Sequence, residues 1–233
     1  MWSYYGSKSR IVHLYPAPKH DKIIEPFAGS ARYALRYFEK DVLLIDKYKT
    51  VIDIWIWLQQ CSEKDILTLP LLKKGEDLRT IDISEAERSF LGMMAGIASV
   101  APRNKISAFS AEQNGRKNYL KRVANNLHKI KHWNFQCEDY LNIKNQKSTW
   151  FIDPPYQFGG HAYVHGNDKI NFSELKSWCE DREGQVVVCE NMSATWMKFN
   201  PLSKMRGANR LHTIEAIWTN EHTHYNNVQQ QLF

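Results

Sequence analysis

Long apolar segments are absent from this chain of 233 residues. No run of about 18 apolar residues occurs, so we expect no membrane-spanning helix and no membrane partner. The first ten residues, MWSYYGSKSR, contain no apolar stretch of the kind that a secretory signal requires. These absences exclude a channel or a transporter, and they predict a cytoplasmic protein.

Paired cysteines are also absent. The spacing of the cysteines excludes a zinc knuckle and a disulfide framework, and isolated thiols are typical of the reducing cytosol. His222 and His224 lie two residues apart, but two histidines do not make a metal site, and we expect no metal. The four cysteines, none of them in a C-x-x-C pair, are Cys61, Cys137, Cys179 and Cys189.

The chain has no internal repeat, and its only low-complexity stretch is a short QQQ near the end. It is 43% hydrophobic and 12% aromatic, with eight tryptophans, which excludes an intrinsically disordered protein. The length suits one long domain, or one domain that carries a compact insertion.

The first third of the chain predicts a β-α-β unit. Residues 21–27 (DKIIEPF) form a short apolar run that Pro26 interrupts, which is typical of a buried strand leading into a turn. Apolar residues recur at helical spacing over 30–39, and residues 41–46 (DVLLID) read as a second strand. A strand, a helix and a strand in this order imply a parallel sheet.

Helical patterns dominate the middle of the chain. Residues 51–58 predict a helix, and Ser84 with Glu87 forms a capping box before an apolar stretch that Pro102 ends. Asn114–Gly115 predicts a turn, and the residues after it have helical spacing. Further strands are expected at 133–137, 149–152, 185–189 and 212–219.

These patterns predict an α/β fold, Rossmann-like, with a mostly parallel central sheet. Residues 1–58 and 133–233 would form the sheet domain, and residues 59–132 would form a mainly helical insertion.

Positive charge is concentrated in one stretch of this insertion. The whole chain carries +6, whereas residues 101–132 contain eight Lys or Arg and one acid, Glu112, and so carry +7. A solvated helix face is one interpretation, but the one-sided concentration beside several amide side chains favours contact with nucleic acid. The candidate contacts are Arg103, Lys105, Arg116, Lys117, Lys121 and Arg122.

The strongest local motif is Asp153-Pro154-Pro155-Tyr156, directly after the apolar run TWFI. A carboxylate at the carboxyl end of a parallel strand lies where open α/β sheets bind ligands. The prolines fix the backbone, and the carbonyls of Asp153 and Pro154 are free to accept from an amino group. Tyr156 adds a flat aromatic face. Such a set suits a planar heterocycle with an amino group, such as adenine or cytosine, although a rigid turn after a strand has the same sequence.

A second motif, Glu25-Pro26-Phe27-Ala28-Gly29-Ser30, places small residues after the first expected strand. They let a ligand approach the backbone, and the absence of G-x-G-x-x-G argues against a nicotinamide dinucleotide. Asp46 ends the second strand 17 residues after Gly29, where a carboxylate commonly accepts from a ribose diol. A nucleoside without a pyrophosphate points to S-adenosylmethionine. Lys8, in the segment YYGSK, could pair with a carboxylate.

Together these residues resemble the Dam-type adenine-specific DNA methyltransferases, in which a cofactor motif, a target-recognition region and DPPY follow one another. The family motifs Tyr-x-Gly-Gly-Lys, Glu-Pro-Phe-x-Gly and Asp-Pro-Pro-Tyr match Tyr4–Lys8, Glu25–Gly29 and Asp153–Tyr156 in order and spacing. The resemblance continues through Arg210–Asn220 and therefore covers nearly the whole chain. Ser7 and Ala31 stand where the family usually has glycine, and both are small replacements.

The resemblance implies an enzyme that methylates the 6-amino group of adenine in double-stranded DNA and releases S-adenosylhomocysteine. Residues 59–132 would recognise the target, and the base would be flipped out of the duplex and stacked on Tyr156. The glycine-containing loop after Tyr156 would close over that base. The catalytic residues would be Asp153, Pro154, Pro155 and Tyr156. The cofactor would be bound by Tyr4, Lys8, Glu25, Phe27, Gly29, Asp46, Asp139 and Asp153.

Several alternatives remain open at this stage. The same chemistry could act on the 4-amino group of cytosine or on an RNA base, and a catalytically silent nucleic-acid-binding protein could use the same scaffold. The closing residues Gln229–Phe233 resemble a peptide by which bacterial DNA-processing proteins dock on the sliding clamp, but we favour a frayed tail. We expect a monomer, encoded by a bacterium or by a phage in a bacterial host.

Overall fold

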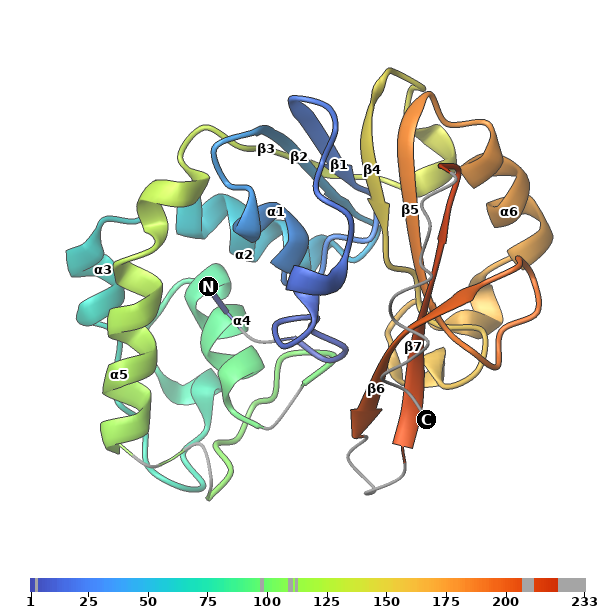
Figure 1. Ribbon diagram of the computed structural model, residues 1–233. Helices are drawn as coiled ribbons and strands as arrows, with labels where there is room; N and C mark the ends of the chain where they lie inside the picture. The colour runs from blue at the N-terminus through green and yellow to red at the C-terminus, as the bar shows by residue number, and fades with distance from the viewer. Residues whose placement is uncertain (3, 97–98, 109–110, 112, 207–211, 222–233) are drawn as a thin grey trace.

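The protein is built on a twisted seven-stranded sheet, counted over the described residues. The computed structural model describes residues 1–2, 4–96, 99–108, 111, 113–206 and 212–221 (Figure 1). The strand order is β3-β2-β1-β4-β5-β7-β6; the first five strands of that order are mutually parallel, and β7 and β6 are antiparallel to their neighbours. The strands are β1 Lys22–Glu25, β2 Asp41–Asp46, β3 Asn134–Cys137, β4 Ser148–Ile152, β5 Gly184–Asn191, β6 Asn200–Arg206 and β7 His212–Thr219.

Six α-helices of the described chain surround this sheet. Their bounds are α1 Arg32–Arg36, α2 Lys49–Gln60, α3 Glu63–Leu67, α4 Glu85–Met94, α5 Gln113–Ala124 and α6 Phe172–Glu180. Short 3₁₀ helices include η1 Val12–Leu14, η2 Leu78–Thr80, η4 Leu127–Ile130, η5 Tyr140–Asn142, η6 Gly160–Ala162 and η7 Asn167–Lys169.

The sheet is covered on both faces, as its apolar strands require. Alternate residues of β4 enter two different cores: Phe151 packs with α1, α2 and the inserted helices, whereas Trp150 and Ile152 pack with α6. Figure 1 shows α1 and α2 on one side of the sheet and α6 on the other. The fold is the Rossmann-like α/β fold that the sequence predicts.

The strand order reverses between β1 and β4. β1 pairs with β2 on one side and with β4 on the other, and all three strands run in the same direction. Connections leave the sheet in opposite directions at such a point, so a crevice opens at the carboxyl ends of the two central strands. The Glu25 and Asp153 motifs both follow these ends.

The inserted helices share a core with the sheet domain. Leu120 and Val123 of α5, and Phe90 of α4, belong to the same buried cluster as Ile23 of β1 and Leu44 of β2. In Figure 1, α3, α4 and α5 lie beside α2 and at a distance from β6 and β7. The insertion therefore does not build a separate core of its own.

All six expected strands are present, but two details differ. Asn114–Gly115 lies in the first turn of α5, so the predicted turn is wrong. Packing of the α5 apolar face outweighs the cost of a helical glycine, about 1 kcal/mol. The capping box at Ser84 is confirmed, but α4 ends at Met94, well before Pro102.

Two elements were not expected from the sequence, α6 and β6. β6 contains Pro201, which cannot donate to a ladder, and its register shifts between Pro201 and Ser203. A proline beside such an irregularity is tolerated because β6 is an edge strand that pairs only with β7.

Candidate active site

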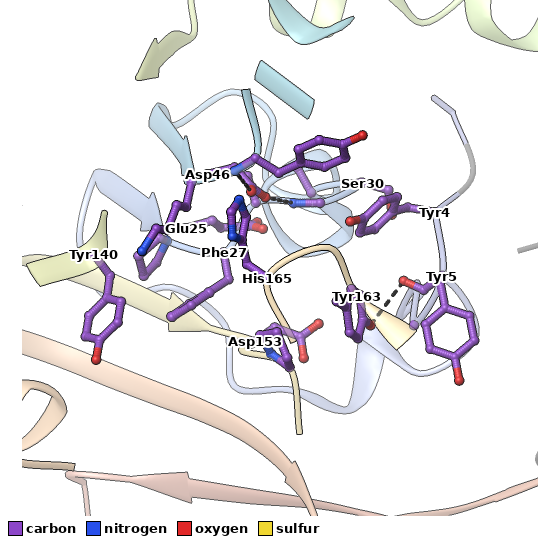
Figure 2. A pocket seen from close by; sticks show the side chains of 18 of the residues that line it. Tyr4, Tyr5, Glu25, Phe27, Ser30, Asp46, Tyr140, Asp153, Tyr163 and His165 are labelled. Carbon is purple, nitrogen blue, oxygen red and sulfur yellow. Dashed lines mark hydrogen bonds between the residues drawn. The ribbon is translucent and has the colours of Figure 1, made fainter. Parts of the chain in front are cut away.

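Motifs from five separate parts of the chain line one pocket at the carboxyl ends of the central strands (Figure 2). The N-terminal segment, the loop after β1, the end of β2, the start of η5 and the loop after β4 all contribute to it. Of the residues expected to bind a cofactor, all line this pocket: Tyr4, Lys8, Glu25, Phe27, Gly29, Asp46, Asp139 and Asp153. Of the other residues expected to be catalytic, Pro155 lines the pocket, whereas Pro154, which is buried, and Tyr156 are not among the lining residues.

Asp46 is fixed by two backbone groups. Its Oδ2 accepts the N–H of Gly29 at 3.1 Å, and its Oδ1 accepts the N–H of Tyr48 at 2.8 Å. Burial nevertheless raises the pKa of Asp46 to about 6, because the two bonds only partly compensate for lost water. Each carboxylate oxygen retains a lone pair for a ligand hydroxyl.

The backbone at Gly29 approaches the pocket closely. Gly29 has φ 44°, and a Cβ there would lie 3.0 Å from Cδ1 of Tyr4. Trp55 donates from Nε1 to the Gly29 carbonyl at 2.9 Å, so both backbone groups of Gly29 are held. A side chain at this position would fill the space between the loop and Tyr4.

An aromatic and acidic corner closes the other end of the pocket. The rings of Phe27 and Tyr140 lie 5.3 Å apart. Lys47 donates to Asp139 Oδ2 at 2.6 Å, and the backbone N–H of Leu141 donates to Oδ1. Burial alone would raise the pKa of Asp139, but these bonds and the charge of Lys47 hold that pKa below its ordinary value.

Glu25 lines the pocket, but its carboxyl group is bound to the helix α1. Its Oε1 accepts the N–H of Ala34 at 2.6 Å and so satisfies a free donor in the first turn of α1. The helix needs this because its N-cap, Ala31, has no side-chain acceptor. Burial raises the pKa of Glu25 to about 8, because the hydrogen bond from Ala34 only partly compensates for the lost water. Ala31 itself has φ 45°, the conformation for which glycine is favoured.

Lys8 joins the N-terminal segment to the Asp153 motif. Its Nζ lies 3.0 Å from Asp153 Oδ1 and 3.3 Å from Glu215 Oε1. Burial alone would lower the pKa of Lys8, but the two carboxylates outweigh burial and keep this pKa above its ordinary value. Burial raises the pKa of Asp153 to about 6; Lys8 lowers it and Glu215 raises it.

Tyr156 points into this charged cluster. Lys8 Nζ donates to its hydroxyl at 2.5 Å, the hydroxyl donates to Glu215, and the ammonium lies 4.4 Å from the ring centroid. The sequence suggested a free ring for stacking. In the structure one face of that ring lies against Lys8.

Glu215 was not identified from the sequence. It lies on β7, 7% exposed, and accepts from Tyr15 at 2.7 Å in addition to its contacts with Lys8 and Tyr156. The available signal was an acid inside the apolar strand HTIEAIWT, since a buried carboxylate requires partners. Its partners lie about 60 or more residues away along the chain, so only the fold reveals them.

The glycine-containing loop after Tyr156 contributes to the pocket wall. Tyr163, Val164 and His165 line the pocket, and Tyr163 Oη donates to the Tyr5 carbonyl at 3.4 Å (Figure 2). The part of the loop between η6 and η7 thus faces the pocket. Its closure over a base stays a prediction.

The candidate nucleic-acid contacts differ in exposure. Arg116 is 5% exposed, and its guanidinium donates to the Leu72 carbonyl at 3.5 Å. Arg116 is therefore buried within the insertion, and its side chain is not exposed for contact with a phosphate. The other five side chains are exposed: Arg103, Lys105, Lys117, Lys121 and Arg122.

Other sequence features are outside the described residues or have no counterpart among them. His222, His224 and Gln229–Phe233 lie outside the described residues. In the ranges that the structure covers, no three His, Cys, Asp or Glu side chains gather as a metal site would require. No helix in those ranges is long and apolar enough to cross a membrane.

No family model and no curated protein matches this chain. Among solved structures, a proposed methyltransferase from Escherichia coli has 11% identity and a TM-score of 0.33, over 84% of this chain and 74% of that one. A proposed methylase from Haemophilus influenzae has 12% identity and a TM-score of 0.36, over 85% and 78% of the two chains. These identities are too low to assign the activity of either protein to this chain.

Proposed function

We propose that this protein is a DNA methyltransferase that transfers a methyl group from S-adenosylmethionine to the 6-amino group of adenine. The observation that carries the proposal is the position of Asp153. Its carboxylate lies at the carboxyl end of β4, is paired with Lys8 at 3.0 Å, and lines the same pocket as Asp46. An acceptor for an amine therefore adjoins a site with the groups that bind a nucleoside.

The pocket residues fit S-adenosylmethionine. Asp46 would accept from the ribose hydroxyls, Phe27 and Tyr140 would contact the adenine ring, and Asp139 would accept from its amino group. The close backbone approach at Gly29 supports this fit, because a Cβ there would meet Tyr4 at 3.0 Å. The pocket has no glycine-rich phosphate loop, consistent with a ligand that has no pyrophosphate. When bound, this cofactor supplies an electrophilic methyl group.

Asp153 and Pro154 would activate the target amine. The nitrogen lone pair of adenine's amino group is delocalised into the ring, so the amine is a weak nucleophile. When the Asp153 carboxylate and the Pro154 carbonyl accept its two hydrogens, the lone pair becomes more available to form the new N–C bond. One proton must then leave the nitrogen, and the Asp153 carboxylate is a base within reach. Positioning and electrostatics supply most of the rate in such a site.

Lys8 and Glu215 would hold Asp153 in its working position. Lys8 contacts Asp153, Glu215 and the Tyr156 hydroxyl, so the three elements that form this corner are tied together. The Lys8 ammonium also favours the charged form of Asp153, the form that accepts hydrogen bonds.

The exposed basic side chains support duplex DNA as the substrate. Lys117, Lys121 and Arg122 lie on α5, and Arg103 and Lys105 precede it. Their charges would neutralise phosphates and offset the cost of flipping a base, a few kcal/mol.

The decisive experiment measures methyl transfer from labelled S-adenosylmethionine to unmethylated DNA and identifies the product base by mass spectrometry. The wild type is expected to form N6-methyladenine, and Asp153→Ala to lose at least about a thousandfold in rate while remaining folded. A matched control is Glu180→Gln, which removes an exposed carboxylate from α6.

Other products would overturn specific parts of the proposal. Methylcytosine would reassign the target base, and transfer to RNA alone would reassign the substrate. Full activity of Asp153→Ala would refute the proposed role of the carboxylate. If the protein binds the cofactor but transfers no methyl group to any nucleic acid, the remaining alternative is a catalytically silent nucleic-acid-binding protein.

A further inference from the structure

A second cavity adjoins the cofactor pocket and has a different chemical character. Ser7 and Arg32 line both cavities, so they form the wall between them. The rest of the second cavity comes from the N-terminal segment, α1, α5 and η4. Its lining residues are Met1, Ser7, Ser9, Arg32, Leu35, Tyr119, Arg122, Asn126 and Lys129.

The charge in this cavity is positive and uncompensated. Arg32, Arg122 and Lys129 all line this cavity, and no carboxylate occurs among its described lining residues. None of the three cations forms an ion pair with an acid in the part of the chain that the structure describes. Burial lowers the pKa of Arg32, and the positive charge of Arg122 lowers it further, while Tyr119 acts in the opposite direction.

Each cation is held in place by contacts that leave its charge unneutralised. The Arg32 guanidinium donates from Nε to Ser7 Oγ at 2.9 Å and from Nη2 to the Trp2 carbonyl at 2.5 Å. The Arg122 guanidinium lies 4.9 Å from the Tyr119 ring, and Lys129 Nζ lies 4.8 Å from the Phe38 ring. Such a preorganised group of like charges is stable only when an anion or bulk solvent screens it.

Ser7 gives the cavity a further donor. Its Oγ accepts from Arg32 Nε at 2.9 Å and from Ser30 Oγ at 3.2 Å. With both contacts arriving as donors, the Ser7 hydroxyl hydrogen can point to a ligand. Ser7 stands where the family that the sequence resembles usually has glycine. Its hydroxyl orients Arg32, a function that glycine could not perform.

We propose that this second cavity binds one phosphate group. Two planar guanidinium groups, an ammonium and a hydroxyl match the three equivalent acceptor oxygens of a phosphate. The phosphate could belong to the DNA backbone, in which case the inference rests on the proposed function, or it could be free inorganic phosphate.

The first test measures the melting temperature in sodium phosphate and in sodium chloride of equal ionic strength. Phosphate is expected to raise the melting temperature of the wild type by several degrees more than chloride does, because a ligand that binds only the folded state stabilises it. Arg122→Gln with Lys129→Gln should lose this difference, and Ser7→Ala should reduce it. The control, Lys64→Gln with Lys144→Gln, removes two exposed positive charges elsewhere and should keep it.

The second test measures the salt dependence of DNA affinity for the same variants. If the slope of log K against log salt falls by about 1 in the Arg122→Gln, Lys129→Gln variant, the bound group is a backbone phosphate. If the slope is unchanged while the phosphate-specific shift is lost, the site takes free phosphate. Both results support the proposal.

The inference is overturned if phosphate and chloride stabilise the wild type equally, or if the cavity variant keeps the full phosphate-specific shift. A failure of the proposed methyltransferase function can be distinguished from a failure of the phosphate site. A wild type that binds phosphate but transfers no methyl group would refute the methyltransferase and leave the phosphate site intact.

Discussion

At the scale of single residues, the site depends on one buried lysine. Lys8 is 8% exposed and sits between Asp153 and Glu215, so two carboxylates compete for one ammonium. Burial raises the pKa of Asp153 from 3.8 to about 6; the charge of Lys8 lowers this pKa, and the charge of Glu215 raises it. A carboxyl group with a pKa of about 6 gains its proton as the pH falls through mildly acidic values.

We expect the transfer rate to fall in acid with the titration of Asp153. The ionised carboxylate is the form that accepts hydrogens from an amine, and the pKa is raised to about 6. The rate should therefore level off above about pH 7 and fall about tenfold per pH unit well below pH 6. A profile of kcat against pH checks this, and a flat profile between about pH 5 and pH 7 would contradict it.

Replacing Glu215 with glutamine should displace this acid limb. The negative charge of Glu215 raises the pKa of Asp153, so its removal should lower that pKa and shift the limb to lower pH. A merely structural role for Glu215 would reduce the rate at every pH without moving the limb. Glu180→Gln, an exposed carboxylate on α6, is the matched control and should leave the limb in place.

At the scale of elements, the loop between β4 and α6 depends on a glycine far away in the sequence. Gly6 has φ 71°, and a Cβ at this position would lie 2.2 Å from the Tyr163 hydroxyl oxygen. The ring of Tyr163 also lies 6.0 Å from the ring of Tyr4 and 5.4 Å from that of Tyr5. The N-terminal segment and this loop therefore form the rim of the pocket together.

Gly6→Ala should weaken binding of S-adenosylmethionine by about tenfold or more, because the added methyl group must displace Tyr163 from the rim. Gly75→Ala provides a closely matched control. Gly75 has φ 84°, but a Cβ there meets nothing within 4 Å, so the variant has the backbone strain without the clash. Titration calorimetry on both variants checks the prediction, and equal affinities would contradict it.

At the scale of the whole molecule, one core extends from the sheet into the inserted helices. Leu120 of α5 is 2% exposed and belongs to the cluster that includes Ile23 of β1 and Trp55 of α2. A cavity made in α5 therefore weakens packing that the sheet also uses. Separate unfolding of the inserted helices would leave apolar residues of α2 in water, which the hydrophobic effect opposes.

We expect a single cooperative unfolding transition. Leu120→Ala should destabilise the protein by about 2–5 kcal/mol, the usual cost of a buried leucine. Tryptophan fluorescence and far-ultraviolet circular dichroism should report the same displaced midpoint. The control is Leu67→Ala on α3, which is 49% exposed and should change little. Two separate transitions would show that the insertion unfolds by itself.

The sequence alone determined the class of the fold and most of the pocket. Runs of four to eight residues located six strands, and the central strands β1, β4 and β5 stand out because parallel strands that are buried on both faces must be continuously apolar. The motifs after two of these runs then followed from the rule that ligands bind at the carboxyl ends of strands. Asp46 and Asp153 could be named in this way because short local patterns mark strand ends, whereas Asp139 was expected only from the family resemblance.

Only the tertiary structure decided which distant groups meet. Glu215 joins Lys8 across the sheet, Arg116 is buried against Leu72, and Arg32 shares a cavity with Arg122 and Lys129. Sequence periodicity assigns a residue to a face of its own element but does not say what covers that face. The role of a charged side chain in particular depends on its surroundings. An arginine can contact a phosphate where water reaches it, and it serves as a structural donor where it is buried in a core.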